Sequence, residues 1–130
     1  MPAKRRFSPD ILAMIQDGQV LGLRAGTAPH RFIGVWAVVV EGRVFVRSWG
    51  LKPRSWYRTF LEEPWGTVQV GNREIPIRAA RTRSERLKDA VDRAYSAKYR
   101  TPWARKIAQG FRRPTRRATT TELVPLSPPS

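Results

Sequence analysis

The stretch GVWAVVVEGRVFVRSW, residues 34–49, contains the clearest structural signal in the sequence. Two runs rich in valine are separated only by Glu41-Gly42, and two residues of this kind between such runs predict a tight β-hairpin. The second run alternates, so Phe45 and Arg47 are expected on the sheet face opposite Val44. The first run hardly alternates, which is typical of a strand covered on both faces.

Helix signals lie on either side of this hairpin. Ser8-Pro9-Asp10 is a good helix start, with a capping serine, proline in the first turn and an acid near the positive end of the helix dipole. Ser55 is expected to cap a short helix over 56–63. Thr82-x-x-Glu85 matches a capping box, which predicts a helix ending near Tyr99.

The remaining patterns predict strands and short connections. A second hairpin is expected from 67–70 and 74–79 across Gly71-Asn72-Arg73, and further strands over 19–24 and 118–124. Because every close connection between strands is a hairpin, the sheet should be antiparallel. The sequence therefore predicts an α+β fold, an antiparallel split β-barrel flanked by helices.

Length and composition predict one small domain. The chain has 130 residues, and we expect a single barrel domain over 1–125 with a disordered, proline-bearing tail over 126–130. The longest apolar run is too short for a membrane span, so a cytoplasmic location without membrane contact is the expectation.

The residue counts also exclude several kinds of site. The sequence has no cysteine and a single histidine, His30, so thiol nucleophiles, Cys- or His-cluster metal sites and a Ser-His-Asp triad with a spare imidazole are all excluded. Its net charge is +15, which favours an anionic partner such as nucleic acid, acidic lipid or a phosphorylated small molecule. The alternative is that arginine serves only as an ordinary surface cation.

A first group of basic residues follows the central hairpin. Arg47-Ser48 is placed at a strand end and Arg54-Ser55 at a helix start, where hydroxyls, guanidinium groups and free amides suit a phosphate. Trp49 and Trp56 nearby offer flat faces that could flank an aromatic ring. The alternative interpretation is a capped helix with exposed arginines and core tryptophans.

Several of these segments together resemble a known family. The segments are Val35-Trp36, Val44 through Trp49, Arg54 through Arg58, and Val68 through Gly71. They are similar to an uncharacterised bacterial domain family related to the FMN-binding split barrels, which include pyridoxamine-phosphate-oxidase-like proteins and deazaflavin-dependent nitroreductases.

The resemblance implies a cofactor site and a homodimer. A cofactor phosphate would lie near Arg47, Ser48, Arg54 and Ser55, and an FMN or deazaflavin ring would lie against the strand containing Trp36. The first hypothesis is therefore a flavin-type oxidoreductase in which the cofactor carries the chemistry. The alternatives are a non-enzymatic basic module that binds nucleic acid or another polyanion, and a split barrel that has lost its cofactor.

A second basic group, Arg100 to Arg117, contains no acid, and Trp103 and Phe111 lie among its cations. Aromatic residues among cations are compatible with nucleic-acid binding. No recognised nucleic-acid motif accompanies the group, so we expect at most weak, sequence-independent binding, and the alternative is a solvated connector.

Overall fold

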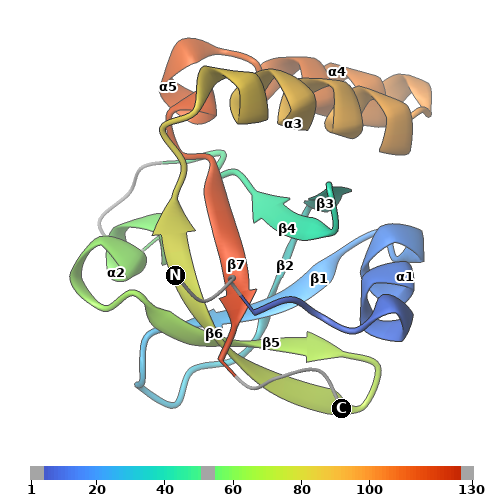
Figure 1. Ribbon diagram of the computed structural model, residues 1–130. Helices are drawn as coiled ribbons and strands as arrows, with labels where there is room; N and C mark the ends of the chain where they lie inside the picture. The colour runs from blue at the N-terminus through green and yellow to red at the C-terminus, as the bar shows by residue number, and fades with distance from the viewer. Residues whose placement is uncertain (1–4, 51–54, 127–130) are drawn as a thin grey trace.

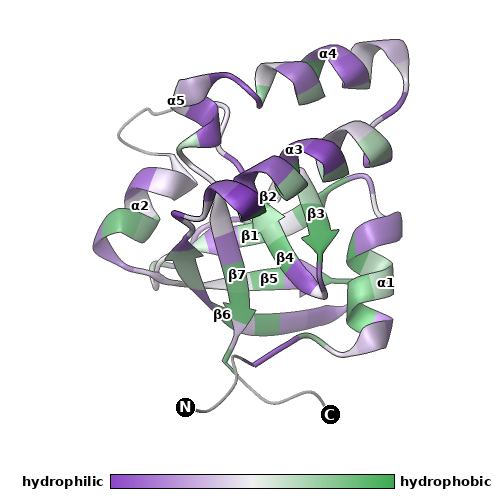
Figure 2. Ribbon diagram, turned by 45° about the horizontal axis from the view of Figure 1, so that its top comes forward, coloured by the Kyte–Doolittle hydropathy of each residue, from purple (hydrophilic) through white to green (hydrophobic). Residues whose placement is uncertain are grey.

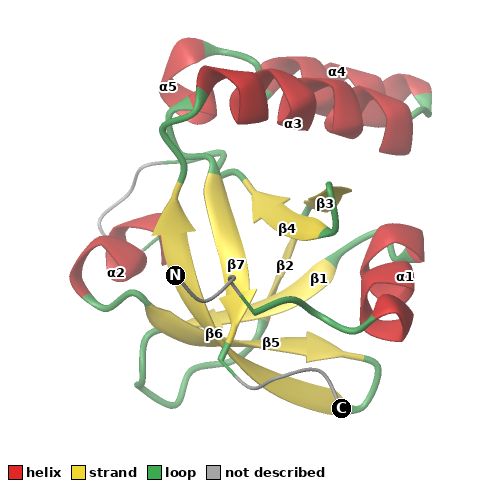
Figure 3. Ribbon diagram, in the orientation of Figure 1, coloured by secondary structure: helices red, strands yellow, loops and turns green. Residues whose placement is uncertain are grey.

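Residues 5–50 and 55–126 are described by the computed structural model, and they form five helices and seven strands (Figure 3). Their order is α1 (Pro9–Asp17), β1 (Leu21–Ala25), β2 (Ile33–Val35), β3 (Ala37–Val40), β4 (Arg43–Val46), α2 (Trp56–Glu62), β5 (Trp65–Val70), β6 (Arg73–Arg81), α3 (Glu85–Lys98), α4 (Pro102–Gly110), α5 (Pro114–Arg117) and β7 (Thr121–Pro125).

The strands form one antiparallel sheet in the order β2-β1-β5-β6-β7-β4-β3. The two strands at the ends of this order, β2 and β3, are neighbours in the chain and are separated only by Trp36. The sheet therefore curls into a nearly closed barrel, with α3, α4 and α5 together beyond one end and α1 and α2 at the sides (Figure 1). The predicted α+β class and antiparallel barrel are confirmed.

Two tight hairpins set the strand register. Glu41 and Gly42 have φ angles of 54° and 71°, as a two-residue turn with left-handed central residues requires. The turn pairs Val40 with Arg43, as the sequence predicted. In the second hairpin Gly71, with φ of 62°, and the next residue form the whole turn, because Arg73 already pairs with Val70. The expected three-residue connection was therefore one residue too long.

The helix starts follow the predicted caps in two cases out of three. The Ser8 and Ser55 hydroxyls accept hydrogen bonds from backbone amides three residues later, at α1 and α2. The start of α3 was wrong, because Ser84 is the capping residue and the backbone amide of Thr82 donates to Thr120. A serine next to the acid competes with the threonine, and sequence spacing alone does not decide between them.

Hydrophobic residues form two layers on either side of the β3–β4 hairpin. The barrel interior is filled from the strands, α1 and α2, and it includes Val44 and Val46 with almost no exposure. Val38 and Phe45 point the other way, into a layer beneath α3 and α4. Figure 2 shows this arrangement as hydrophobic β3 and β4 beneath a largely hydrophilic α3. The hairpin is thus covered on both faces, and the predicted alternation of Val44 and Phe45 is confirmed.

Element ends differ from the sequence prediction near the site. β4 ends at Val46 rather than at 49. β7 begins at Thr121 rather than at 118, because residues 118–120 form the turn that ends α5 and their backbone amides donate to carbonyls of that helix. Leu126 still donates a backbone hydrogen bond to Pro76, so the chain is attached to the sheet at the first residue of the expected tail. The rest of that tail, 127–130, lies outside the described residues.

Candidate functional site

The barrel opens at Trp36. The ladder between β3 and β4 runs from the pair Val40–Arg43, next to the turn, to the pair Ala37–Val46, where it stops. β2, on the other side of Trp36, pairs instead with β1. The strand that the sequence predicted as one run over 34–40 therefore changes partner at Trp36, and the two halves diverge from that point.

A tyrosine hydroxyl occupies the place where the ladder would continue. The backbone amide of Arg47 donates to the Tyr95 hydroxyl at 3.1 Å, and this hydroxyl donates to the Trp36 carbonyl at 2.6 Å. The next ladder pair would have been Trp36 with Arg47. Burial raises the pKa of Tyr95, so the hydroxyl stays protonated and keeps both bonds. Tyr95 thus replaces a direct bond between the strands and holds the split open.

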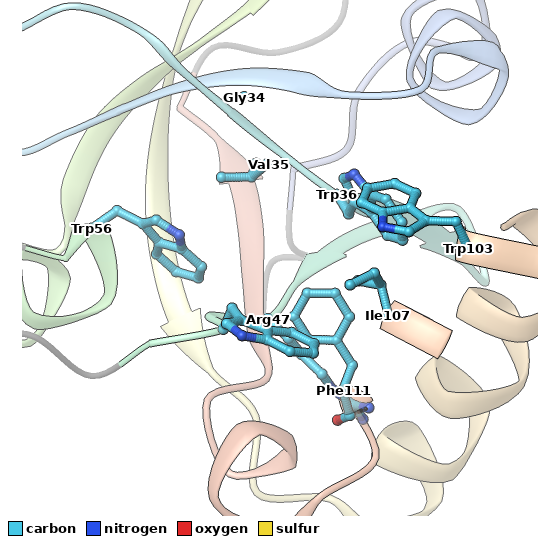
Figure 4. A pocket seen from close by; sticks show the side chains of 9 residues that line it. Gly34, Val35, Trp36, Arg47, Trp56, Trp103, Ile107 and Phe111 are labelled. Carbon is cyan, nitrogen blue, oxygen red and sulfur yellow. Dashed lines mark hydrogen bonds between the residues drawn. The ribbon is translucent and has the colours of Figure 1, made fainter. Parts of the chain in front are cut away.

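A cleft of about 310 Å³ lies in this split (Figure 4). One wall of the cleft is the edge of β2, and a second is the segment that follows β4. The remaining walls are α4 and the start of α2. The lining residues are Gly34, Val35, Trp36, Arg47, Trp49, Trp56, Trp103, Ile107 and Phe111. Four tryptophans and a phenylalanine from four separate segments therefore meet around one space.

The aromatic side chains around the cleft pack against one another. Trp36 stacks on Tyr99 with ring centroids 4.0 Å apart and an interplanar angle of 9°, and Trp103 meets it edge-on at 5.8 Å. Phe111 meets Trp49 edge-on at 5.3 Å. Trp103 and Trp49 nevertheless stay 66% and 45% exposed, so apolar ring surface remains open at the mouth of the cleft.

Arg47, the first predicted phosphate ligand, is buried and directed into the protein. Its guanidinium donates to the Asp92 carboxylate, the Thr120 hydroxyl at 2.8 Å, and the backbone carbonyls of Phe111 and Lys88. Burial lowers the pKa of Arg47, and the hydrogen bond to Asp92 acts in the opposite sense. These contacts tie β4 to α3, α4 and the start of β7, so Arg47 supports the floor of the cleft.

Asp92 connects this arginine to a second one. Its other carboxylate oxygen accepts a hydrogen bond from Arg117, which also contacts Glu85 and Asp89 along the same side of α3. The Arg47 side chain has no exposed surface and that of Asp92 is 15% exposed, whereas Glu85 and Asp89 are largely exposed. The acids that face Arg47 and Arg117 are therefore supplied by α3.

The predicted serines make hydrogen bonds within the protein. The Ser48 hydroxyl donates to the Gly50 carbonyl, and its amide donates to the Thr119 hydroxyl at 2.8 Å. The Ser55 hydroxyl accepts from the Arg58 amide as the cap of α2. Arg54, the remaining predicted phosphate ligand, lies outside the described residues. The assignment of a phosphate to these four residues stays a prediction.

The structure brings together three of the predicted site residues, Trp36, Arg47 and Trp56, around the cleft. The sequence reasoning did not place Trp103, Ile107 and Phe111 there, although two of them stood out as aromatic residues within the second basic group. The sequence feature that could have placed them is the spacing of alanines in α4, because Ala104 and Ala108 are buried and bring one face of the helix onto the barrel. Helical spacing from those alanines would have placed Trp103 and Ile107 near that face.

Comparisons with known proteins agree with this architecture. Residues 10–123 match a family described as an uncharacterised protein conserved in bacteria, DUF2255. The chain belongs to this family. A crystal structure of a conserved hypothetical protein from Mycobacterium tuberculosis is similar, with a TM-score of 0.56 and 12% sequence identity over 95% of this chain and 82% of that one. At that identity the likeness shows the fold alone. No curated protein matches the chain.

The DUF2255 match spans every wall of the cleft, from α1 to β7. The family description gives no activity, so the chemistry has to be argued from the cleft. Within the described residues, no helix of this DUF2255 chain is long and apolar enough to cross a membrane.

Proposed function

We propose that this DUF2255 protein binds a flat heteroaromatic cofactor of the flavin type, FMN or a deazaflavin, with its ring in the tryptophan-lined cleft, and acts as an oxidoreductase. The observation that carries the proposal is the convergence of Trp36, Trp49, Trp56 and Trp103 on one open space. A homodimer, which the split-barrel resemblance implies, is part of the same proposal.

The size and chemistry of the cleft suit a ring. Its volume of about 310 Å³ lies at the lower end of the range of roughly 300–1,000 Å³ typical of small-molecule sites. Exposed indole faces favour stacking with a planar π-system. On the side away from β1, β2 has no strand partner among the described residues, so its backbone edge is available to donors and acceptors on a ring.

The residues fit the ring of such a cofactor better than its phosphate. The Arg47 guanidinium already donates hydrogen bonds to Asp92 and to backbone and hydroxyl oxygens, and the Ser48 hydroxyl donates to the Gly50 carbonyl. A phosphate held there would have to displace bonds that join the barrel to α3 and α4. We therefore assign Arg47 a positioning role, in which it holds Phe111 and the strand end against the cleft.

The residues around the cleft leave the redox chemistry to the cofactor. Among the described lining residues there is no carboxylate, imidazole or thiol to act as an acid, base or nucleophile. A bound flavin or deazaflavin would supply hydride or electron transfer. The protein would orient the ring between aromatic faces and exclude water from one side of it.

Flavin titration of the purified protein tests the proposal. Aromatic stacking quenches flavin fluorescence, so FMN, riboflavin and a deazaflavin should each be tested for saturable quenching. Trp103→Ala should weaken binding by roughly tenfold, since one stacking contact contributes about 1–3 kcal/mol. Trp103 is 66% exposed, so its removal should leave folding intact.

Trp65→Ala is the matched control. Trp65 is 43% exposed at the start of β5, where it lies beside Arg78 and does not line the cleft. Its removal should leave flavin affinity unchanged. Absence of saturable binding by the unmutated protein, or equal loss in the two variants, would contradict the proposal.

The second candidate function, a nucleic-acid or polyanion binder, is favoured by the exposed cations of α4. Arg105 and Lys106 are exposed there, and Arg112 and Arg113 follow in the next turn. Such binding should weaken steeply with salt, because each neutralised phosphate releases counterions. Oligonucleotide binding with this salt dependence, in a protein that binds no flavin, would favour this candidate instead.

A further inference from the structure

A second pocket shares Trp49 with the aromatic cleft. It has a volume of about 520 Å³ and lies between α4 and α5. Its lining residues are Trp49, Lys106, Gln109, Gly110, Arg113 and Arg116. Trp49 lines both spaces, so the second pocket is the one next to the wall of the cleft that this indole forms.

Among the residues that the structure describes, no acid pairs with the cations of this pocket. No acid occurs between Arg100 and Thr121 in the sequence. Within the described part of the chain, Lys106 and Arg113 form no ion pair. The neighbouring Arg117, by contrast, forms ion pairs with three carboxylates of α3. The fold therefore pairs one arginine of this segment with acids and leaves adjacent cations around an open space.

Arg116 is held in a fixed position at the wall of the pocket. Its guanidinium lies over the Trp49 ring at 3.5 Å from the centroid, and its Nε donates to the Trp49 carbonyl at 3.0 Å. One of its terminal nitrogens donates to the Gly110 carbonyl at 3.3 Å. The other is not used in any of these bonds. A guanidinium fixed in this way loses little freedom when it binds an anion.

Gly110 is what lets the indole approach so closely. A Cβ at this position would lie 2.4 Å and 2.7 Å from two ring carbons of Trp49. Carbon atoms cannot approach to such distances, so a larger residue would push the indole away from α4. The shared wall of the cleft and the basic pocket thus depends on a glycine between Lys106 and Arg113.

We infer that this basic pocket binds the phosphate monoester of the cofactor whose ring lies in the aromatic cleft, with Lys106, Arg113 and Arg116 as its cationic ligands. The inference rests on the proposed function and places the phosphate away from Arg47 and Ser48, whose donors are engaged. A basic pocket of limited extent beside an aromatic cleft suits a small phosphorylated molecule better than a nucleic-acid strand, which needs a groove that follows its backbone.

Comparison of FMN with riboflavin isolates the phosphate. The two share the ring and the ribityl chain, and only FMN carries the monoester. In titrations followed by flavin fluorescence, the unmutated protein should bind FMN at least tenfold more tightly than riboflavin. Lys106→Gln and Arg113→Gln should each lower the affinity for FMN by roughly tenfold, because each removes a charge-assisted contact. Neither variant should change the affinity for riboflavin.

Arg105→Gln is the matched control. Arg105 is exposed, adjacent to Lys106 on α4, and does not line the pocket, so its removal changes the net charge equally without touching the site. It should leave the preference for FMN over riboflavin intact. A loss of preference equal to that of Lys106→Gln would overturn the inference in favour of a diffuse effect of charge.

The remaining outcomes separate the two proposals. Equal affinity for FMN and riboflavin in the unmutated protein would overturn the phosphate site and leave the ring site standing. Absence of binding by both would overturn the proposed function and this inference with it. Tight binding of a single-stranded oligonucleotide that weakens equally in the variants at 105, 106 and 113 would overturn the pocket in favour of a polyanion surface.

Discussion

The cations that follow the β3–β4 turn, within residues 42–61, and those of α4 and α5, within residues 100–117, look alike in the sequence, because neither segment contains an acid. The fold nevertheless pairs some of these cations with acids and leaves others around a pocket. Arg43 and Arg47 point inward and meet Glu122 and Asp92, 79 and 45 residues away. Lys106 and Arg113 remain around an open pocket. The availability of a cation for a ligand is therefore decided by distant acids, which a local charge count does not reveal.

The largest expected effect follows from breaking the inward network. Asp92→Asn removes the charge that faces both Arg47 and Arg117, and it leaves the Arg47 guanidinium buried without a counter-charge. Loss of one partner of a buried pair typically costs about 3–5 kcal/mol. Urea unfolding should therefore show a large drop in the free energy of unfolding for this variant.

Glu41→Gln is the matched control for that measurement. It removes an equally close ion pair, with Arg86, in which both side chains are largely exposed. Exposed pairs contribute little to stability, so the unfolding midpoint should hardly move. If the two variants were equally stable, the distinction between inward and outward arginines would fail.

The sequence predicted what local chemistry determines. The Glu41-Gly42 turn, the Ser8 and Ser55 caps and the alternation of Val44 with Phe45 all depend on neighbours in the chain, and all three are confirmed. From these the antiparallel barrel could be assembled.

The split itself depends on contacts that are distant in sequence. The hydroxyl of Tyr95 reaches the strand end from α3, 59 residues after Trp36, so nothing near Trp36 indicates a break. The same holds for Phe111, which closes the cleft from the end of α4. The tryptophans near the hairpin were recognised as ring surfaces, but the space between them exists only once the helices are placed.

Lys98 is a third kind of cation, because it points inward but is held by carbonyl oxygens and by no carboxylate among the described residues. Its Nζ donates to the carbonyls of Ile15 and Ala37 at 2.9 and 2.7 Å. Burial lowers the pKa of Lys98 to about 8, and the charge of Asp17 acts in the opposite sense. The unfolded chain, with an ordinary lysine pKa near 10.4, therefore binds more protons than the folded chain between these values.

Stability should consequently rise with pH from about 8 to about 10. The gain should be on the order of 1–2 kcal/mol, allowing for the partial exposure of the side chain. Above about pH 10 stability should fall, because burial raises the pKa of Tyr95 and Tyr99 and only the unfolded chain loses these protons. Urea titrations across this range should show the rise in the unmutated protein and lose it in Lys98→Met. An identical slope in both would assign the rise to other groups.

The smallest expected effect concerns the outward cations. Lys106→Gln combined with Arg113→Gln removes two positive charges from a chain of net charge +15 and breaks no ion pair among the described residues. The free energy of unfolding should change by less than about 0.5 kcal/mol. Its sign is the informative part, because relief of self-repulsion should make the variant slightly more stable.

Ionic strength separates this gain from any loss of structure. Repulsion between exposed charges is screened over about 8 Å at physiological salt and about 30 Å at 0.01 M, so the gain should appear at low salt and vanish at high salt. Arg117→Gln is the opposite case, since it removes three carboxylate contacts and should be destabilising at both salt concentrations. Destabilisation of the double variant to the same degree would mean that Lys106 and Arg113 make stabilising contacts in the folded chain. That result would contradict their description as cations left unpaired around the pocket.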